Sequence, residues 1–240
     1  MARKSRITLT GMPYHVVQRG NNRQACFFAE QDFLFYVECL KEAIRKYQCQ
    51  LHAYVLMTNH VHLLMTPQQD NGISKVMQSV GRRYVQYINY TYRRTGTLWE
   101  GRYKSSLVDA DHYLLACYRY IELNPVRANM VNNPAEYRWL SYRWHADGEG
   151  NPLITDHDVY LCLGGDSESR QARYRELFRP HMDQELVHAI RVSIKHNAAL
   201  GSELFKAQIE TAIGRCVRPT PVGRPRKFEI NESYVSYYGN

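Results

Sequence analysis

Met57-Thr58-Asn59-His60-Val61-His62-Leu63-Leu64-Met65 is the stretch that decides the fold. Side chains alternate between the two faces of a β-strand, so His60 and His62 are predicted to project from one face while Val61 and Leu63 point into a core. Two imidazoles on one sheet face are well placed to share a divalent cation, although such a pair is more often solvated or hydrogen-bonded.

The pattern around this strand predicts a small mixed domain. Strands are expected at residues 14–18, 51–57, 60–65 and 103–108, and Thr58-Asn59 can turn one central strand directly into the next. Apolar residues at helical spacing predict helices at 32–47 and 73–93, and a third from Asp109 or Asp111 to 123, where Pro125 forbids continuation. This order favours the α+β class, with a ferredoxin-like antiparallel sheet and helices on one face.

The composition changes after Trp144. Residues 146–152 have the composition of a linker or an exposed loop, and three further helices are expected near 169–178, 184–196 and 203–213. We therefore predict two units, a domain at residues 1–145 and a mostly helical, basic extension at 146–240.

Composition and charge narrow the function classes. The 240 residues are 44% hydrophobic and 22% charged, as in ordinary globular proteins, and no run of 18 apolar residues predicts a membrane span. No secretory signal is visible, and the six cysteines form no CxxC pair, so free thiols in the cytoplasm are expected. A net charge of +8 favours an anionic partner, nucleic acid first, although many proteins of this kind are mildly basic.

The third predicted helix contains a candidate nucleophile. Tyr120 and Asn124 are four residues apart and share a helix face, whereas Tyr118 falls on the apolar stripe with Leu114 and Ile121. A tyrosine hydroxyl can attack a phosphodiester in line, and a nearby cation would polarise and position the phosphate. The chain has 19 tyrosines, so the spacing favours Tyr120 over Tyr118 only modestly.

These residues resemble a known family, the REP-associated tyrosine transposases, which belong to the single-tyrosine HUH transposases. The resemblance runs from Tyr14 to about Tyr142, and its ordered motifs are residues 15–23, 57–62, 94–105, 120–125 and 137–142. It implies His60 and His62 as metal ligands, Tyr120 as the nucleophile and Asn124 as the third ligand. Relatives outside this branch carry glutamine at the position of Asn124. The implied cofactor is Mg²⁺ or Mn²⁺.

Basic and aromatic side chains are candidate contacts to DNA. Those in the domain are Arg19, Arg23, Arg82, Arg83, Arg94, Trp99, Arg102 and Lys104. Trp99, in a glycine-flanked loop, is a candidate for base stacking or a plug of the domain edge. Gly223-Arg224-Pro225-Arg226-Lys227 resembles an AT-hook core, which would place Arg224 and Arg226 in an A·T minor groove.

The expected function is a metal-dependent endonuclease and strand-transferase acting on single-stranded and hairpin DNA, with palindromic repeats as substrate and a 5′-phosphotyrosine intermediate. A replication-initiation nuclease or relaxase would share this chemistry. A catalytically silent DNA-binding regulator is the alternative from another class. Related enzymes exist as monomers and as swapped dimers, so both states remain open.

Overall fold

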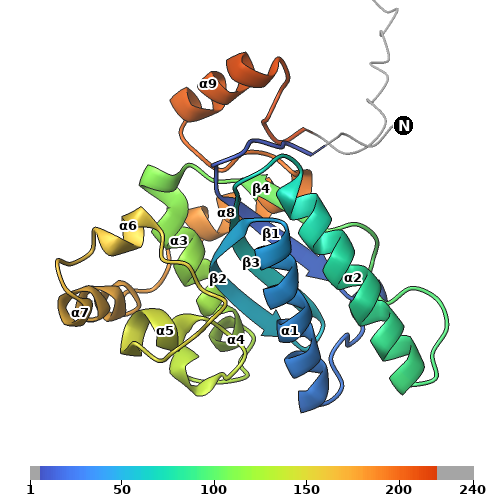
Figure 1. The fold of residues 1–240 in the computed structure, drawn as a ribbon. Coiled ribbons are helices and arrows are strands. Elements are labelled where there is room, and N and C mark those ends of the chain that lie inside the picture. The colour runs from blue at the N-terminus through green and yellow to red at the C-terminus, as the bar shows by residue number, and fades with distance from the viewer. Residues whose placement is uncertain (1–5, 221–240) are drawn as a thin grey trace, which may run out of the picture.

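The computed structural model describes residues 6–220. A four-stranded antiparallel sheet lies at its centre, with strands in the order β2-β3-β1-β4 (Figure 1). The strands are β1 (Tyr14–Arg19), β2 (Cys49–Met57), β3 (His60–Pro67) and β4 (Lys104–Leu107). The antiparallel sheet of the predicted fold class is therefore confirmed, with the hairpin of β2 and β3 at one edge.

Two long helices cover one face of the sheet. They are α1 (Glu30–Lys46) and α2 (Gly72–Thr91), which lie side by side in front of the strands in Figure 1. Their apolar stripes share a core with Val61, Leu63 and Met65 of β3 and with Val16 of β1. The alternation predicted for β3 is thus met on this face, where the odd-numbered residues are buried.

The opposite face is covered by α3 (Ala110–Glu122), a short helix α4 (Asn124–Arg127) and helices of the C-terminal extension. The expectation of helices on one face holds for α1 and α2 but not for α3, which packs against β2 and β3 from behind them. The physical reason is that Ala53, Val55 and Leu64 make the second face of the sheet apolar as well, and that face requires its own cover.

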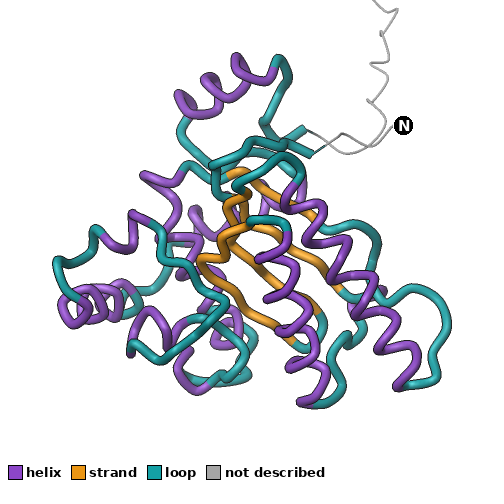
Figure 2. Tube along the Cα trace, viewed as in Figure 1, coloured by secondary structure: helices purple, strands orange, loops and turns teal. Residues whose placement is uncertain are grey.

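The C-terminal extension folds onto this second face, except for its last helix, whose Ile209 belongs to the core beneath α1 and α2. Its helices are α5 (Tyr142–Asp147), α6 (Asp158–Leu161), α7 (Ser167–Leu177), α8 (Gln184–His196) and α9 (Glu203–Ile213), and Figure 2 shows its helical character. The predicted unit boundary at residue 145 falls inside α5, and one hydrophobic core joins α3, α5, α7 and α8. No described helix is long and apolar enough to cross a bilayer. All six cysteines are free.

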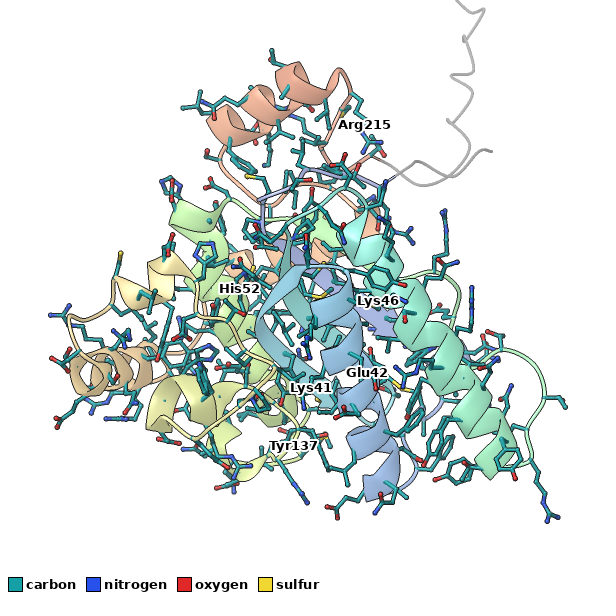
Figure 3. All side chains as sticks on the ribbon, in the orientation of Figure 1. Lys41, Glu42, Lys46, His52, Tyr137 and Arg215 are labelled. Atoms are coloured by element: carbon teal, nitrogen blue, oxygen red, sulfur yellow. The ribbon has the colours of Figure 1, made fainter. Side chains whose placement is uncertain are left out.

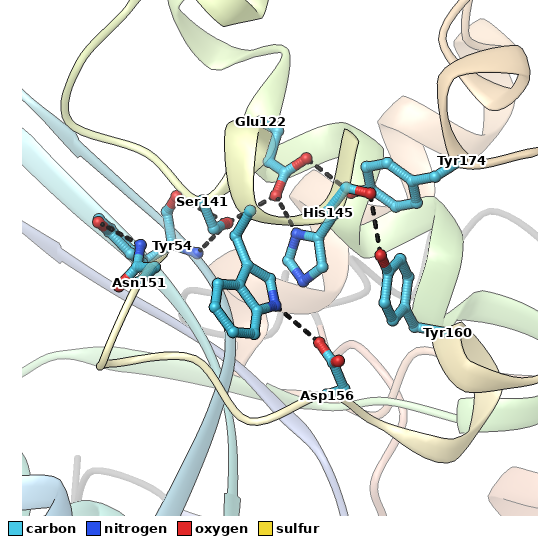
Figure 4. Close-up of polar contacts among 9 residues, drawn as sticks. Tyr54, Glu122, Ser141, His145, Asn151, Asp156, Tyr160 and Tyr174 are labelled. Carbon is cyan, nitrogen blue, oxygen red and sulfur yellow. Dashed lines mark hydrogen bonds and ion pairs between the residues drawn. The ribbon is translucent and has the colours of Figure 1, made fainter. Parts of the chain in front are cut away.

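A buried polar cluster ties α3 to the extension (Figure 4). Glu122, at the end of α3, accepts hydrogen bonds from the Ser141 hydroxyl at 2.6 Å, from His145 Nδ1 at 3.0 Å and from the Tyr174 hydroxyl at 2.6 Å. All four side chains are buried, so the carboxylate depends on these donors in place of water. The helix that carries Tyr120 is therefore held by residues of α5 and α7.

Candidate active site

A cleft of about 660 Å³ opens where β1, β3 and β4 face α3 and α8. The candidate nucleophile and metal ligands all line it, and they come from one chain. The side chains that line it include Arg19, Arg23, His60, His62, Glu100, Arg102, Lys104, Tyr120, Asn124, Arg191, Ile194 and Lys195.

The two histidines project from β3 into this cleft. Their ring centroids are 5.0 Å apart, and strand β1 lies beside them, with Val17 opposite His62 and Arg19 opposite His60. Burial lowers the pKa of His60 to about 4 and that of His62 well below its usual value. Both imidazoles are therefore neutral near pH 7, the state in which a ring nitrogen can bind a metal ion.

The hydrogen bonds of these two rings leave one nitrogen of each free to bind a divalent cation. The Asn59 amide oxygen lies 2.6 Å from His60 Nδ1, which must donate to it, so the lone pair of His60 is on Nε2. His62 Nδ1 shares a hydrogen bond of 2.8 Å with Nε2 of the buried His15, whose Nδ1 has no partner among the described residues. When His62 Nδ1 is the donor, its Nε2 is also free for a metal. His15 acts as an outer partner that orients His62.

The third candidate ligand lies just beyond the end of α3. The amide nitrogen of Asn124 donates to the Tyr120 carbonyl at 3.4 Å, which leaves Oδ1 as the atom available to a cation. The described residues contain no group of three or more His, Cys, Asp or Glu side chains suited to a metal. Two imidazoles and one amide oxygen are thus the available donor set, and carbonyl oxygens with open water positions suit Mg²⁺ or Mn²⁺.

Helix α3 places its two tyrosines on opposite sides. Tyr118 is fully buried and packs edge-on against His145 and Tyr174. Tyr120 lines the cleft, and its ring centroid is 5.9 Å from that of His62. Residues two apart on a helix differ by about 200°, which is why packing one ring in the core turns the other toward the sheet.

A cation lies directly against the Tyr120 ring. The guanidinium carbon of Arg127, on α4, is 4.2 Å from the ring centroid, and a guanidinium nitrogen donates to the Tyr120 carbonyl at 2.6 Å. No carboxylate within the described part of the chain pairs with Arg127. Arg127 therefore holds a positive charge against the ring of the candidate nucleophile.

The structure brings four of the predicted DNA-contacting residues to the cleft and not the others. Arg19, Arg23, Arg102 and Lys104 line it. Arg82 is exposed on α2, on the other face of the sheet, and Arg83 there pairs with Glu42 of α1. Arg94 lies 5.5 Å from the Phe28 ring, also outside the cleft.

Trp99 is only 6% exposed and packs near Tyr84, so it plugs the edge of the domain in this conformation. Arg224 and Arg226 lie outside the described residues.

Five residues of this site were not predicted from the sequence. They are His15, Arg127, Arg191, Ile194 and Lys195, whose roles depend on tertiary neighbours. The alternation of β1 does place His15, Val17 and Arg19 on the face of His62, and this was the one available signal. The other residues lie on α4 and α8, and no local sequence pattern predicts where these helices pack.

Comparison with known proteins defines the class of this domain. The model of the family "Transposase IS200 like" matches residues 8–124, the segment that contains both histidines, Tyr120 and Asn124. This segment is therefore similar to the IS200-like transposases, and the resemblance seen in the sequence is confirmed.

One solved structure shares the fold of this chain, and a second aligns less closely. A REP-associated tyrosine transposase bound to a REP hairpin aligns with a TM-score of 0.54 and 16% identity, over 65% of this chain and 93% of that one. A structure from Deinococcus radiodurans R1, described as a candidate transposase, aligns with a TM-score of 0.35 and 19% identity, over 54% of this chain and 96% of that one. No curated protein matches the chain.

Proposed function

We propose that this protein is a metal-dependent endonuclease and strand-transferase for single-stranded DNA, and that hairpin-forming palindromic repeats are its substrate. One observation carries the proposal: Tyr120 and the pair His60 and His62 line one basic cleft, with the Tyr120 and His62 ring centroids 5.9 Å apart. A nucleophile and a candidate metal site at this separation suit attack on a phosphodiester between them.

The proposed reaction is a transesterification. The Tyr120 oxygen attacks the phosphorus in line, its proton passes to solvent, and the bond to the 3′ oxygen breaks. That oxygen takes up a proton, which gives a free 3′-OH and a 5′-phosphotyrosine. Attack by another 3′-OH reverses the step, joins the strands and releases Tyr120 as the phenol. The bond energy is stored in the phosphotyrosine, so no nucleotide cofactor is consumed.

The residues of the cleft have separate parts in this reaction. Arg127 lies against the attacking ring and favours the charge that develops on its oxygen. A Mg²⁺ or Mn²⁺ ion held by His60, His62 and Asn124 would polarise the scissile phosphate. Arg19, Arg102 and Lys104 would hold the flanking backbone of the strand by charge.

The hairpin substrate is supported by the fold and by the charge of the cleft. The structure that shares this fold was solved with a REP hairpin bound. Six arginine and lysine side chains line the cleft here against one carboxylate, that of Glu100. A strand with one charge per nucleotide suits such a surface.

Cleavage of end-labelled DNA tests the proposal. Palindromic repeats from DNA that flanks the gene provide the hairpins, with the matching duplex as the control. We expect cutting of the single-stranded form only, one product with a free 3′-OH and the other with protein on its 5′ end. Two free DNA ends, or cutting of the duplex alone, would contradict it.

Loss of the metal ligands tests the cofactor. His60→Ala and His62→Ala, or an excess of chelator, should abolish cleavage and leave hairpin affinity nearly unchanged, because basic side chains supply most of the affinity. Full cleavage in chelator would overturn the metal assignment. Hairpin binding without cleavage under any metal condition would favour the silent regulator.

A further inference from the structure

One wall of the cleft comes from the C-terminal extension. Helix α8 contributes Arg191, Ile194 and Lys195, which line the same cleft as His60, His62 and Tyr120. These three positions are spaced three and four apart and so form one face of the helix. The sequence placed the complete catalytic constellation before residue 146, whereas the cleft itself is completed by residues about 70 positions beyond Tyr120.

Helix α8 is held in this position by the segment that follows it. Asn197 ends the helix in the left-handed conformation, and its side-chain oxygen accepts a hydrogen bond of 3.1 Å from the Ser105 amide of β4. The next residues run beside β4, where the Leu200 amide donates to the Leu107 carbonyl at 2.7 Å and the Leu200 carbonyl accepts from Asp109 at 2.8 Å. The wall is therefore attached to the sheet by main-chain hydrogen bonds.

The two cations on this wall form no ion pair within residues 6–220. Both Arg191 and Lys195 are exposed. Burial lowers the pKa of Arg127, and the charge of Arg191 acts in the same direction, so these two like charges are neighbours. An anion between the wall and α3 would relieve this repulsion.

A solvated helix face is the simpler explanation for such residues. The negative end of the helix dipole does favour Lys195, which lies in the last turn of α8. It does not account for Arg191, one turn earlier, or for the apolar Ile194 that lines the polar cleft beside the two charges. Two cations next to an apolar side chain suit phosphates and the sugar or base that they carry.

We infer that α8 binds the phosphodiester backbone of the DNA strand next to the scissile phosphate, with Arg191 and Lys195 on phosphates and Ile194 against the intervening nucleoside. This inference rests on the proposed function, because it takes single-stranded DNA as the occupant of the cleft. It makes the extension part of the substrate site, supplied by the same chain that supplies Tyr120.

Binding of labelled single-stranded DNA at several salt concentrations tests the wall. Arg191→Ala with Lys195→Ala is compared with Lys41→Ala and Arg45→Ala. The control pair has the same spacing and charge change and lies on exposed positions of α1, on the far face of the sheet. Lys41 is labelled in Figure 3. Two lost phosphate contacts should lower the salt slope by about 1.4 and weaken binding by about tenfold. The control pair should change neither by more than about twofold.

Equal effects in the two double variants would overturn the inference, since net charge alone would then explain them. Because this experiment measures binding and not cleavage, its outcome is independent of whether the proposed function is correct. If the protein cleaves DNA through Tyr120 but the α8 double variant binds DNA normally, the proposed function stands and the inference about α8 fails. If the protein does not cleave DNA but the α8 double variant binds it weakly, the inference about α8 stands and the proposed function fails.

Crosslinking locates the contact. A photoreactive phenylalanine analogue in place of Ile194 should crosslink to nucleotides within two or so positions of the cut site, and the same analogue at exposed Lys41 should not. Crosslinks from position 194 only to distant nucleotides, or none at saturating DNA, would overturn the assignment.

Discussion

The hydroxyl of Tyr174 donates a hydrogen bond of 2.6 Å to Glu122, a carboxylate two residues beyond Tyr120 on α3. The second carboxylate oxygen accepts from Ser141 and His145 (Figure 4). Residues of α5 and α7 thus hold the helix that presents the candidate nucleophile. The extension is joined to the N-terminal domain through a buried carboxyl group as well as through a shared apolar core.

Removal of this carboxylate should destabilise the whole chain. Glu122→Ala leaves three buried donors without an acceptor, and we expect a loss of about 3–5 kcal/mol in the free energy of unfolding. Tyr174→Phe removes one hydroxyl and should cost about 1–3 kcal/mol. Urea denaturation measures both. Equal and small effects in the two variants would show that the cluster does not anchor α3.

Arg127 should matter for the rate of cleavage more than for DNA binding. Arg127→Met removes the charge beside the Tyr120 ring, and the side chain does not line the cleft. We expect the single-turnover cleavage rate to fall by about 10- to 100-fold with little change in Kd. Arg127→Lys should recover part of the rate, since it keeps the charge. A variant that cleaves at the normal rate would remove Arg127 from the mechanism.

Local patterns predicted much of this fold because its elements have clear periodicity. The alternation around His60-Val61-His62 matches the structure, where Val61 lies under α1 and α2 and His62 faces α3. Helical spacing separated Tyr118 from Tyr120 for the same reason: one ring packs in a core and the other lies on the cleft.

The remainder depends on contacts that sequence spacing cannot show. Arg83 was a predicted contact to DNA, but Glu42 of the neighbouring helix pairs with it. Trp99 lies in a glycine-flanked loop that folds back onto Tyr84. The second apolar face of the sheet was missed because strand residues buried on both faces lack a simple alternation. That face is where α3 and α8 build the cleft.

The buried His52 predicts how stability depends on pH. Its Nδ1 donates to the Thr155 carbonyl at 2.8 Å, and burial lowers its pKa to about 4. The unfolded chain binds this proton near pH 6.5, so stability is complete above that value and falls as the pH drops toward 4.

Urea denaturation from pH 7 to pH 5 checks this prediction. The free energy of unfolding of the normal protein should fall more steeply than that of His52→Gln, by up to about 1.4 kcal/mol per pH unit. Other buried histidines contribute equally to both proteins, so the difference reports His52 alone. Parallel curves would contradict the lowered pKa.

Deletion of residues 221–240 tests the predicted AT-hook segment, which contains Arg224 and Arg226. The deletion should stop there, because Val217 is buried and its carbonyl accepts a hydrogen bond of 2.8 Å from Ala199. We expect normal cleavage of a saturating oligonucleotide and weaker, less salt-dependent binding to A·T-rich duplex. A clear drop in melting temperature with unchanged duplex binding would reject the hook.

The central claim is that Tyr120 forms a covalent bond to DNA, and peptide mapping of the adduct tests it most directly. The protein is incubated with hairpin DNA and Mn²⁺, denatured and digested, and the modified peptide is identified by mass spectrometry. We expect a nucleotide attached to Tyr120, no adduct in Tyr120→Phe and a normal adduct in Tyr118→Phe, its neighbour in the core. An adduct that persists in Tyr120→Phe, or that maps to Tyr118, would contradict the account.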